Sequence, residues 1–186
     1  MKRIILLSFV SMLLSVGTTM AEGISSAREL VAFATAANAG EDITPWADRE
    51  GVISLTADID MAKVKDFVPI AVYDGLFDGG CHTISNWKTT AGLFHIVSEK
   101  AVVRNLTIDA SCSMKCTDNG EEEFYAGFIA DVNHGTLEGC INRGQISHRS
   151  GKSLMSNYVG GICGMNKYIV INCDNYGNVS SSGNFG

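Results

Sequence analysis

The chain has 186 residues, of which 20 are acidic and 14 are basic, and its formal net charge is −6 at pH 7. An acidic chain whose Lys and Arg residues do not cluster along the sequence argues against nucleic acid or an anionic membrane as a partner. Glycine occurs 20 times and proline twice. This composition suits many turns between short strands better than a disordered linker.

Residues 1–21 are predicted to be a cleaved signal peptide. Lys2 and Arg3 form a positively charged start, residues 4–16 are apolar, and Thr19–Ala21 supply the small residues of a cleavage site. The apolar run is too short to span a bilayer comfortably, so we expect export without a transmembrane segment. This segment holds two bases and no acids, so the remaining chain, residues 22–186, is more acidic than the whole. Its length suits one domain.

Residues 22–45 are predicted to form an N-terminal capping segment with a short α-helix. Ser26 can cap the helix, Glu29 completes a capping box, and Gly40 marks the end. One apolar stripe is made by Leu30, Phe33, Ala34 and Ala37. The stripe must be buried, and we expect it to cover the first turn of a stacked repeat domain. The alternative is a helix on the side of a sheet.

Residues 52–55 are predicted to form a strand, followed by two acids, Asp58 and Asp60. In an extended chain both side chains point the same way, and paired acids can bind Ca²⁺ or act as acid and base. Together with Lys63 and His82 they are the only clustered candidates for catalysis. A polar turn after a strand is the interpretation we favour, so no catalytic, metal-binding or cofactor-binding residue is predicted.

One short sequence unit occurs twice between residues 126 and 180. The copies read AGFIADVNHGTLEGCINRGQIS and GGICGMNKYIVINCDNYGNVS. Their shared positions recur at one constant interval and include Cys140, Asn142 and Gly144 in the first copy and Cys173, Asn175 and Gly177 in the second. A fixed period of this size is typical of stacked repeat architectures. The two asparagines are predicted to stack as an amide ladder.

Residues 91–108 read as a degenerate earlier copy. The glycines aligned across the three copies are Gly92, Gly127 and Gly161. Gly164 of the last copy is matched by Ala130 and His95 in the earlier ones. A further alignment matches Ile84 to Val103, an interval well below that of the later copies, and it predicts that an earlier unit is shorter.

Two expectations concern four of the six cysteines. Cys112 and Cys116 flank a predicted loop and are the best disulfide candidates. Cys140 and Cys173 are expected on neighbouring strands about 4.8 Å apart, where parallel side-chain directions are poor for a bridge. We therefore expect them to be reduced and stacked in the core. No zinc-site spacing occurs.

Two insertions interrupt the repeat. The first, residues 112–123, is acidic but lacks the spacing of a calcium loop, so a solvated loop is favoured over a metal site. The second, residues 148–153, is basic and belongs to GQISHRSGKS. This stretch differs from a phosphate-binding loop because Gly144 and Gly151 stand further apart than the two glycines of that motif.

Several segments resemble the GLUG-repeat proteins, namely FDGGCHTISNW, AGLFHIV, VVRNLTI, GGICGMN and INCDNYGNV. That family comprises secreted or cell-surface proteins of Bacteroidetes-type gut bacteria. The resemblance implies a right-handed parallel β-helix over residues 46–186 with a capping segment before it, and it carries no catalytic residues. Asn184–Gly186 read like the start of another coil, so we expect the coils to be incomplete at this end.

These patterns together predict an all-β solenoid with a non-enzymatic function. The expected function is that of a secreted or cell-surface module for adhesion, for binding of an extracellular glycan or a host or matrix protein, or for use as a rigid stalk. Nucleic acid is not expected as a partner. The alternative is an extracellular polysaccharide lyase or glycosidase, or the accessory stalk of one, because parallel β-helices also host such enzymes.

Overall fold

The computed structural model describes residues 23–118, 123–151 and 156–182. Its strands form five sheets. The first contains, in spatial order, β1 (Val52–Ser54), β4 (Leu76–Asp78), β8 (Val102–Arg104), β13 (Thr136–Glu138) and β18 (Ile169–Ile171). The second contains β2 (Ile59–Asp60), β5 (Thr83–Ser85), β9 (Thr107–Ile108), β14 (Ile141–Asn142) and β19 (Asp174–Asn175).

The remaining sheets are smaller. The third contains β6 (Lys88–Thr89), β10 (Ser113–Thr117), β15 (Gln145–Arg149) and β20 (Val179–Ser182). The fourth contains β3 (Ile70–Tyr73), β7 (Phe94–Val97), β12 (Ala130–Asn133) and β17 (Cys163–Asn166). The fifth contains only β11 (Glu123–Gly127) and β16 (Ser156–Gly160).

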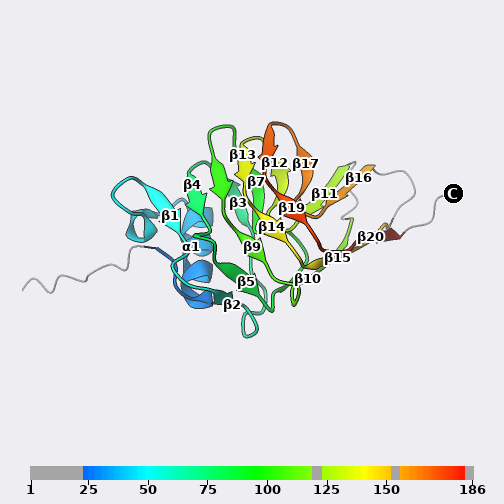
Figure 1. Ribbon diagram of the computed structural model, residues 1–186, viewed down its shortest axis with the longest axis horizontal. Helices are drawn as coiled ribbons and strands as arrows, with labels where there is room; N and C mark the ends of the chain where they lie inside the picture. Colours follow the sequence, from blue (N-terminus) through cyan, green and yellow to red (C-terminus); the bar gives the residue numbers. More distant parts are fainter. Residues whose placement is uncertain (1–22, 119–122, 152–155, 183–186) are drawn as a thin grey trace, which may run out of the picture.

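The chain runs through these sheets in a constant cyclic order, and we call each complete round a pass. From β3 onward, each pass runs through the fourth, first, second and third sheets before it returns to the fourth, and the later passes add a strand of the fifth sheet. Each strand pairs in parallel with its counterpart in the next pass, so the passes succeed one another across Figure 1. Among the described residues, this mostly β architecture of parallel sheets with one α-helix is consistent with a parallel solenoid.

The core lies inside the passes, because alternate residues of each strand point inward. In the first sheet the inward positions align in register as Ile53, Phe77, Val103, Leu137 and Val170. The first four are at most 2% exposed. Val170, on the last described pass, is 39% exposed. Burial therefore falls steeply from β13 to its neighbour β18.

Helix α1 (Ala27–Ala39) is the first element of the described residues. The Ser26 hydroxyl accepts the Glu29 N–H at 3.3 Å, and Gly40 ends the helix in the left-handed conformation at φ 67°, which glycine adopts without strain. The ring of the buried residue Phe33 contacts Tyr73 and Phe77 at centroid distances of 6.3 Å each. The 3₁₀-helix η1 (Thr44–Trp46) follows. No helix among the described residues is both long and apolar enough to cross a membrane.

Strand register corrects two alignments made from the sequence. Ile84 pairs with Ile108 and not with Val103. The earlier pass is therefore shorter than the later ones, as predicted, but it is longer than the interval from Ile84 to Val103. Gly127 pairs with Gly160 and not with Gly161. The doublet of glycines allowed two alignments, and only the one that keeps the period of the neighbouring positions occurs.

The same one-residue slip affects the residue matched to Gly164. Ala130 pairs with Cys163 and Val132 with Met165, so Asp131, not Ala130, lies opposite Gly164. Asp131 is 1% exposed, and its carboxylate accepts the N–H groups of Gly92 and Gly127 at 3.1 and 3.3 Å.

Candidate functional site: a polar face and its pocket

The third sheet presents an outer surface that is rich in hydroxyl and cationic groups. Strands β10 and β15 alternate strictly, with buried residues such as Met114 and Ile146 facing inward and exposed residues such as Lys115 and Arg149 facing outward. Because the side-chain period of a strand is two residues, the outward positions of neighbouring strands form rows. These rows make one continuous surface.

We call this surface the polar face. Register places Lys115 beside Ser147 and Ser180, and Thr117 beside Arg149 and Ser182. Its members are Lys88, Ser113, Lys115, Thr117, Gln145, Ser147, Arg149, Ser180 and Ser182. None of these carries a carboxylate, although the chain as a whole is acidic. The polar face is therefore a local cationic region on a negatively charged molecule.

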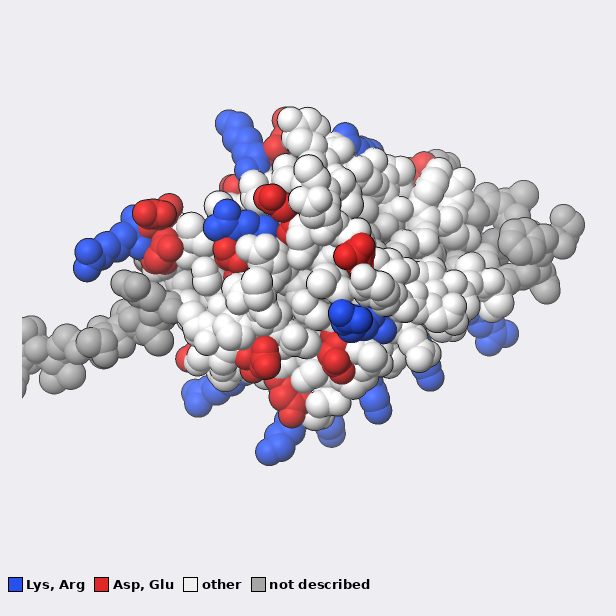
Figure 2. All heavy atoms as spheres, in the orientation of Figure 1, with Lys and Arg blue, Asp and Glu red and all other residues white. Residues whose placement is uncertain are grey.

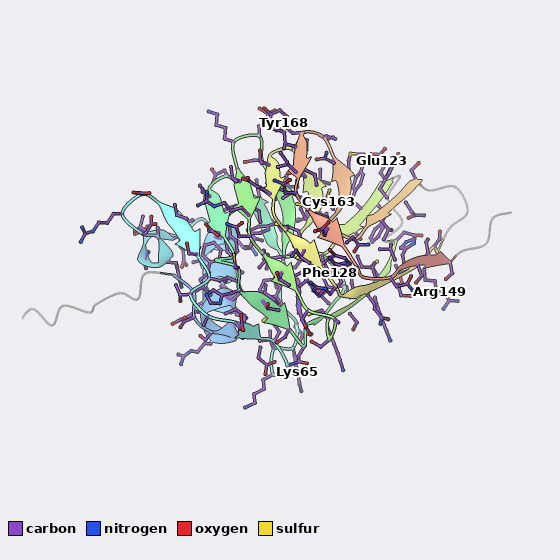
Figure 3. All side chains as sticks on the ribbon, in the orientation of Figure 1. Lys65, Glu123, Phe128, Arg149, Cys163 and Tyr168 are labelled. Atoms are coloured by element: carbon purple, nitrogen blue, oxygen red, sulfur yellow. The ribbon has the colours of Figure 1, made fainter. Side chains whose placement is uncertain are left out.

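The figures place this surface along one margin of the molecule. Strands β10, β15 and β20 lie along the lower right margin of Figure 1. Figure 2 shows Lys and Arg side chains projecting along the lower margin in the same orientation. Figure 3 labels one member of the polar face, Arg149, toward the right of the view. The strand register spreads the three cations, Lys88, Lys115 and Arg149, over three neighbouring strands.

An open pocket of about 350 Å³ lies at the β6 end of the polar face. It is lined by Asp66, Phe67, Lys88, Thr89, Thr90, Ser113 and Lys115. The volume is at the lower end of the range for small-molecule sites. Its lining combines one aromatic ring with charged groups and hydroxyls, a set that can fix the orientation of a polar ligand.

The wall formed by Asp66 and Phe67 is held in place by the core beneath it. The Phe67 ring meets Trp87 edge-on at a centroid distance of 5.5 Å, and Trp87 is 1% exposed. Asp66 has φ 41°, a left-handed conformation that Asp adopts more readily than most residues. The packed ring and the turn together present both side chains at the pocket.

Sequence reasoning missed this site. Lys88, Lys115 and Arg149 lie on three different passes and form no cluster along the chain. The signal that could have found them is the repeat itself, since charges at equivalent positions of successive passes must fall on one face. The prediction that the chain lacks a cationic cluster holds for the sequence but not for the folded surface.

The two acids considered for catalysis form hydrogen bonds to the next pass of the chain. Asp58 accepts the Thr83 N–H at 2.9 Å and lies 3.3 Å from His82 Nδ1; the Thr83 hydrogen bond is the main cause that lowers the pKa of Asp58. Asp60 accepts the Asn86 side chain at 2.9 Å, and this bond lowers the pKa of Asp60. Both carboxylates thus link neighbouring passes in their ionised form.

The loop predicted between Cys112 and Cys116 is instead strand β10. Extended chain between these two positions separates their Cα atoms by about 13 Å, beyond the reach of about 7 Å for a disulfide. All six cysteines lie among the described residues and are free. Burial raises the pKa of both thiols, that of Cys116 to about 11, so each behaves as a core side chain.

Cys140 and Cys173 lie next to each other on neighbouring passes. Cys140 is fully buried and its N–H donates to Cys173 Sγ at 3.3 Å. The side chain of Cys173, together with burial, raises the pKa of Cys140, whereas the contact with Cys140 lowers that of the half-buried Cys173. Any thiolate in this pair therefore forms first on Cys173.

The repeated pairs Asn142–Gly144 and Asn175–Gly177 form one recurring turn motif. Asn142 Nδ2 donates to Asn175 Oδ1 at 2.8 Å, and Asn142 Oδ1 accepts the Gly144 N–H at 2.9 Å. A Cβ atom at Gly177 would collide with the Gly144 carbonyl, and one at Gly161 with the Asn175 amide. Gly177 is required because two successive passes approach closely here, and Gly161 because its backbone lies against the Asn175 side chain of its own pass.

A second amide pair was not predicted. Asn133 Nδ2 donates to Asn166 Oδ1 at 2.8 Å, and Asn133 Oδ1 accepts the Gly135 N–H at 3.0 Å. These two asparagines have the same separation along the chain as Asn142 and Asn175, so the period could have identified them.

Comparison with known proteins gives little further information. No family model and no curated protein matches the chain. A crystal structure from Bacteroides ovatus, described as a "putative immunoglobulin A1 protease", is similar with 20% identity and a TM-score of 0.47. The match covers 72% of this chain, which spans about half (52%) of that protein. The GLUG-repeat resemblance thus remains a prediction.

Proposed function

We propose that the chain is an exported, non-enzymatic module that binds an extracellular glycan through the polar face. We further propose that its passes form a right-handed parallel β-helix with α1 as the cap, because crossovers between parallel strands are right-handed in about 98% of cases. Export is inferred from residues 1–21, which lie outside the described residues. The GLUG-like segments support the same location.

The observation that carries this proposal is the composition of the polar face. Its serine and threonine hydroxyls both donate and accept hydrogen bonds, and its cations and Gln145 add further donors. Regular rows across a sheet suit an extended ligand with repeating polar groups, which is the chemistry of a polysaccharide. A stalk without a ligand would need neither the cationic excess nor the pocket.

Glycan-array binding of the purified full chain tests the proposal. Ser147→Trp puts a bulky ring in the middle of the polar face and should weaken binding at least tenfold. Glu138→Trp is the matched control, because Glu138 is an exposed outward position of another sheet, and it should bind like the unchanged protein. Circular dichroism verifies that both variants fold.

Two results would overturn the proposal. Failure of the folded chain to bind any glycan would leave only the stalk interpretation or a protein ligand. Shortening of a bound glycan, measured by size-exclusion chromatography after incubation, would contradict the non-enzymatic part.

A further inference from the structure

Two lysines, Lys88 and Lys115, line the pocket, and neither forms an ion pair within the described part of the chain. Lys88 pairs with Ser113 across neighbouring strands, and Lys115 is the next outward residue of β10 after Ser113. The two lysines are therefore diagonal neighbours, whose Cβ atoms lie about 7–8 Å apart on a sheet. Both side chains are long enough to reach one anionic group between them. Their mutual repulsion would be relieved by such a group.

The rest of the lining matches a sugar ring that carries a negative charge. Two lysines against Asp66 give the pocket a net positive charge. Phe67 offers an aromatic surface to the apolar side of a sugar, while Asp66 can accept hydrogen bonds from sugar hydroxyls. Thr90 and Ser113 provide further hydroxyls. An uncharged sugar would leave the net positive charge of the pocket without an anionic partner.

We propose that the pocket binds the carboxylate of a uronic acid residue within a polysaccharide chain, with Lys88 and Lys115 as the paired cationic contacts. This inference rests on the proposed function and names its ligand class. A residue within a chain is favoured over a terminal acidic sugar because the pocket is open and the polar face continues from it across β10, β15 and β20. Neighbouring sugars then lie along the rows of hydroxyls.

Isothermal titration calorimetry of the full chain against three probes tests this assignment. Tetragalacturonate carries internal carboxylates, its fully methyl-esterified form has the same shape without charge, and sialyllactose carries one terminal carboxylate. We expect tetragalacturonate to bind at least tenfold more tightly than either of the others. Raising the salt concentration should weaken only the charged probes.

Single substitutions then locate the contact. Lys88→Gln and Lys115→Gln should each reduce the affinity for tetragalacturonate at least tenfold and leave that for the methyl ester unchanged. Lys100→Gln is the control, because it removes the same charge from an exposed turn, and it should have no effect. All three positions are exposed, so folding should be unaffected.

The other outcomes separate the two proposals. Equal affinity for acid and ester, tighter binding of sialyllactose, or full affinity in both pocket variants would overturn the uronate assignment but leave glycan binding intact. If none of the probes binds while the array identifies an uncharged glycan, the uronate assignment is likewise wrong. If neither method detects a ligand, both proposals fail.

Discussion

His148 is a titratable residue on the inner side of β15. It is 1% exposed, its ring stacks on Phe124 at a centroid distance of 5.2 Å, and its Nδ1 lies 2.9 Å from the Ser181 hydroxyl. Nε2 is buried and has no hydrogen-bond partner in the described structure. Protonation would place an uncompensated charge on this nitrogen, so burial lowers the pKa of His148 in the fold.

This lowered pKa predicts a pH-dependent stability. Between the lowered value and about 6.5, the unfolded chain binds a proton at His148 that the folded chain does not. The free energy of unfolding should therefore fall as the pH decreases below about 6.5. Urea denaturation at several pH values measures it, with His148→Phe as the comparison. An equally steep decrease in the variant would show that another group is responsible.

At the scale of the element, the contribution of a strand to the free energy of unfolding depends on whether it has a neighbouring strand on each side. β13 lies between β8 and β18, whereas β18 is the last described strand of the same sheet. Leu137 and Val170 occupy the same register position in these strands. Leu137 is fully buried, but Val170 is 39% exposed. Equivalent positions of the repeat are therefore not equivalent in energy.

Truncating these two residues should reveal the difference. Leu137→Ala removes buried methyl groups and leaves a cavity, which costs about 2–5 kcal/mol of unfolding free energy. Val170→Ala removes a partly exposed side chain and should cost less than about 1 kcal/mol. Chemical denaturation of the full chain measures both values. Similar losses would mean that β18 is covered in solution by contacts that the described residues lack.

The strand register also explains which features the sequence could predict. Cys140, Asn142 and Gly144 each recur at the same interval, so the later passes were recognisable. Earlier passes are shorter and keep only the burial pattern, which is why Ile84 was aligned with the wrong residue. In SMKCT the inward Met114 and Cys116 alternate with outward Lys115, but the neighbouring acids suggested a loop. The pocket could not be predicted without the strand register, because residues from separate passes line it.

On the scale of the whole molecule, α1 joins the first passes through one polar side chain as well as through its apolar stripe. Asn38 Nδ2 donates to the Pro69 carbonyl at 2.9 Å, and Asn38 Oδ1 accepts the Ala71 N–H at 2.7 Å. The Asn38 amide therefore bonds to the edge of β3 in the way a neighbouring strand would. Here α1 satisfies backbone groups that the sheet leaves unpaired at this edge.

Removing this side chain should weaken the attachment of the helix. Asn38→Ala leaves one backbone N–H and one carbonyl at the β3 edge without these partners, and we expect a loss of about 1–2 kcal/mol in unfolding free energy. Asn178→Ala, at an exposed position, is the control and should change stability by less than about 0.5 kcal/mol. Hydrogen exchange should also accelerate at the Ala71 amide in the first variant only. Unchanged exchange there would contradict the proposed role of Asn38.

The two asparagine pairs give the stack of passes a direction. In both, the amide nitrogen of the earlier pass donates to the amide oxygen of the later one, from Asn142 to Asn175 and from Asn133 to Asn166. The glycine N–H groups that bond to Asn142 Oδ1 and Asn133 Oδ1 fix which amide atom is which. A segment stacked in the reverse sense would bring like groups together at both pairs. The side-chain amides therefore favour one orientation of a stacked pass and disfavour the reversed orientation.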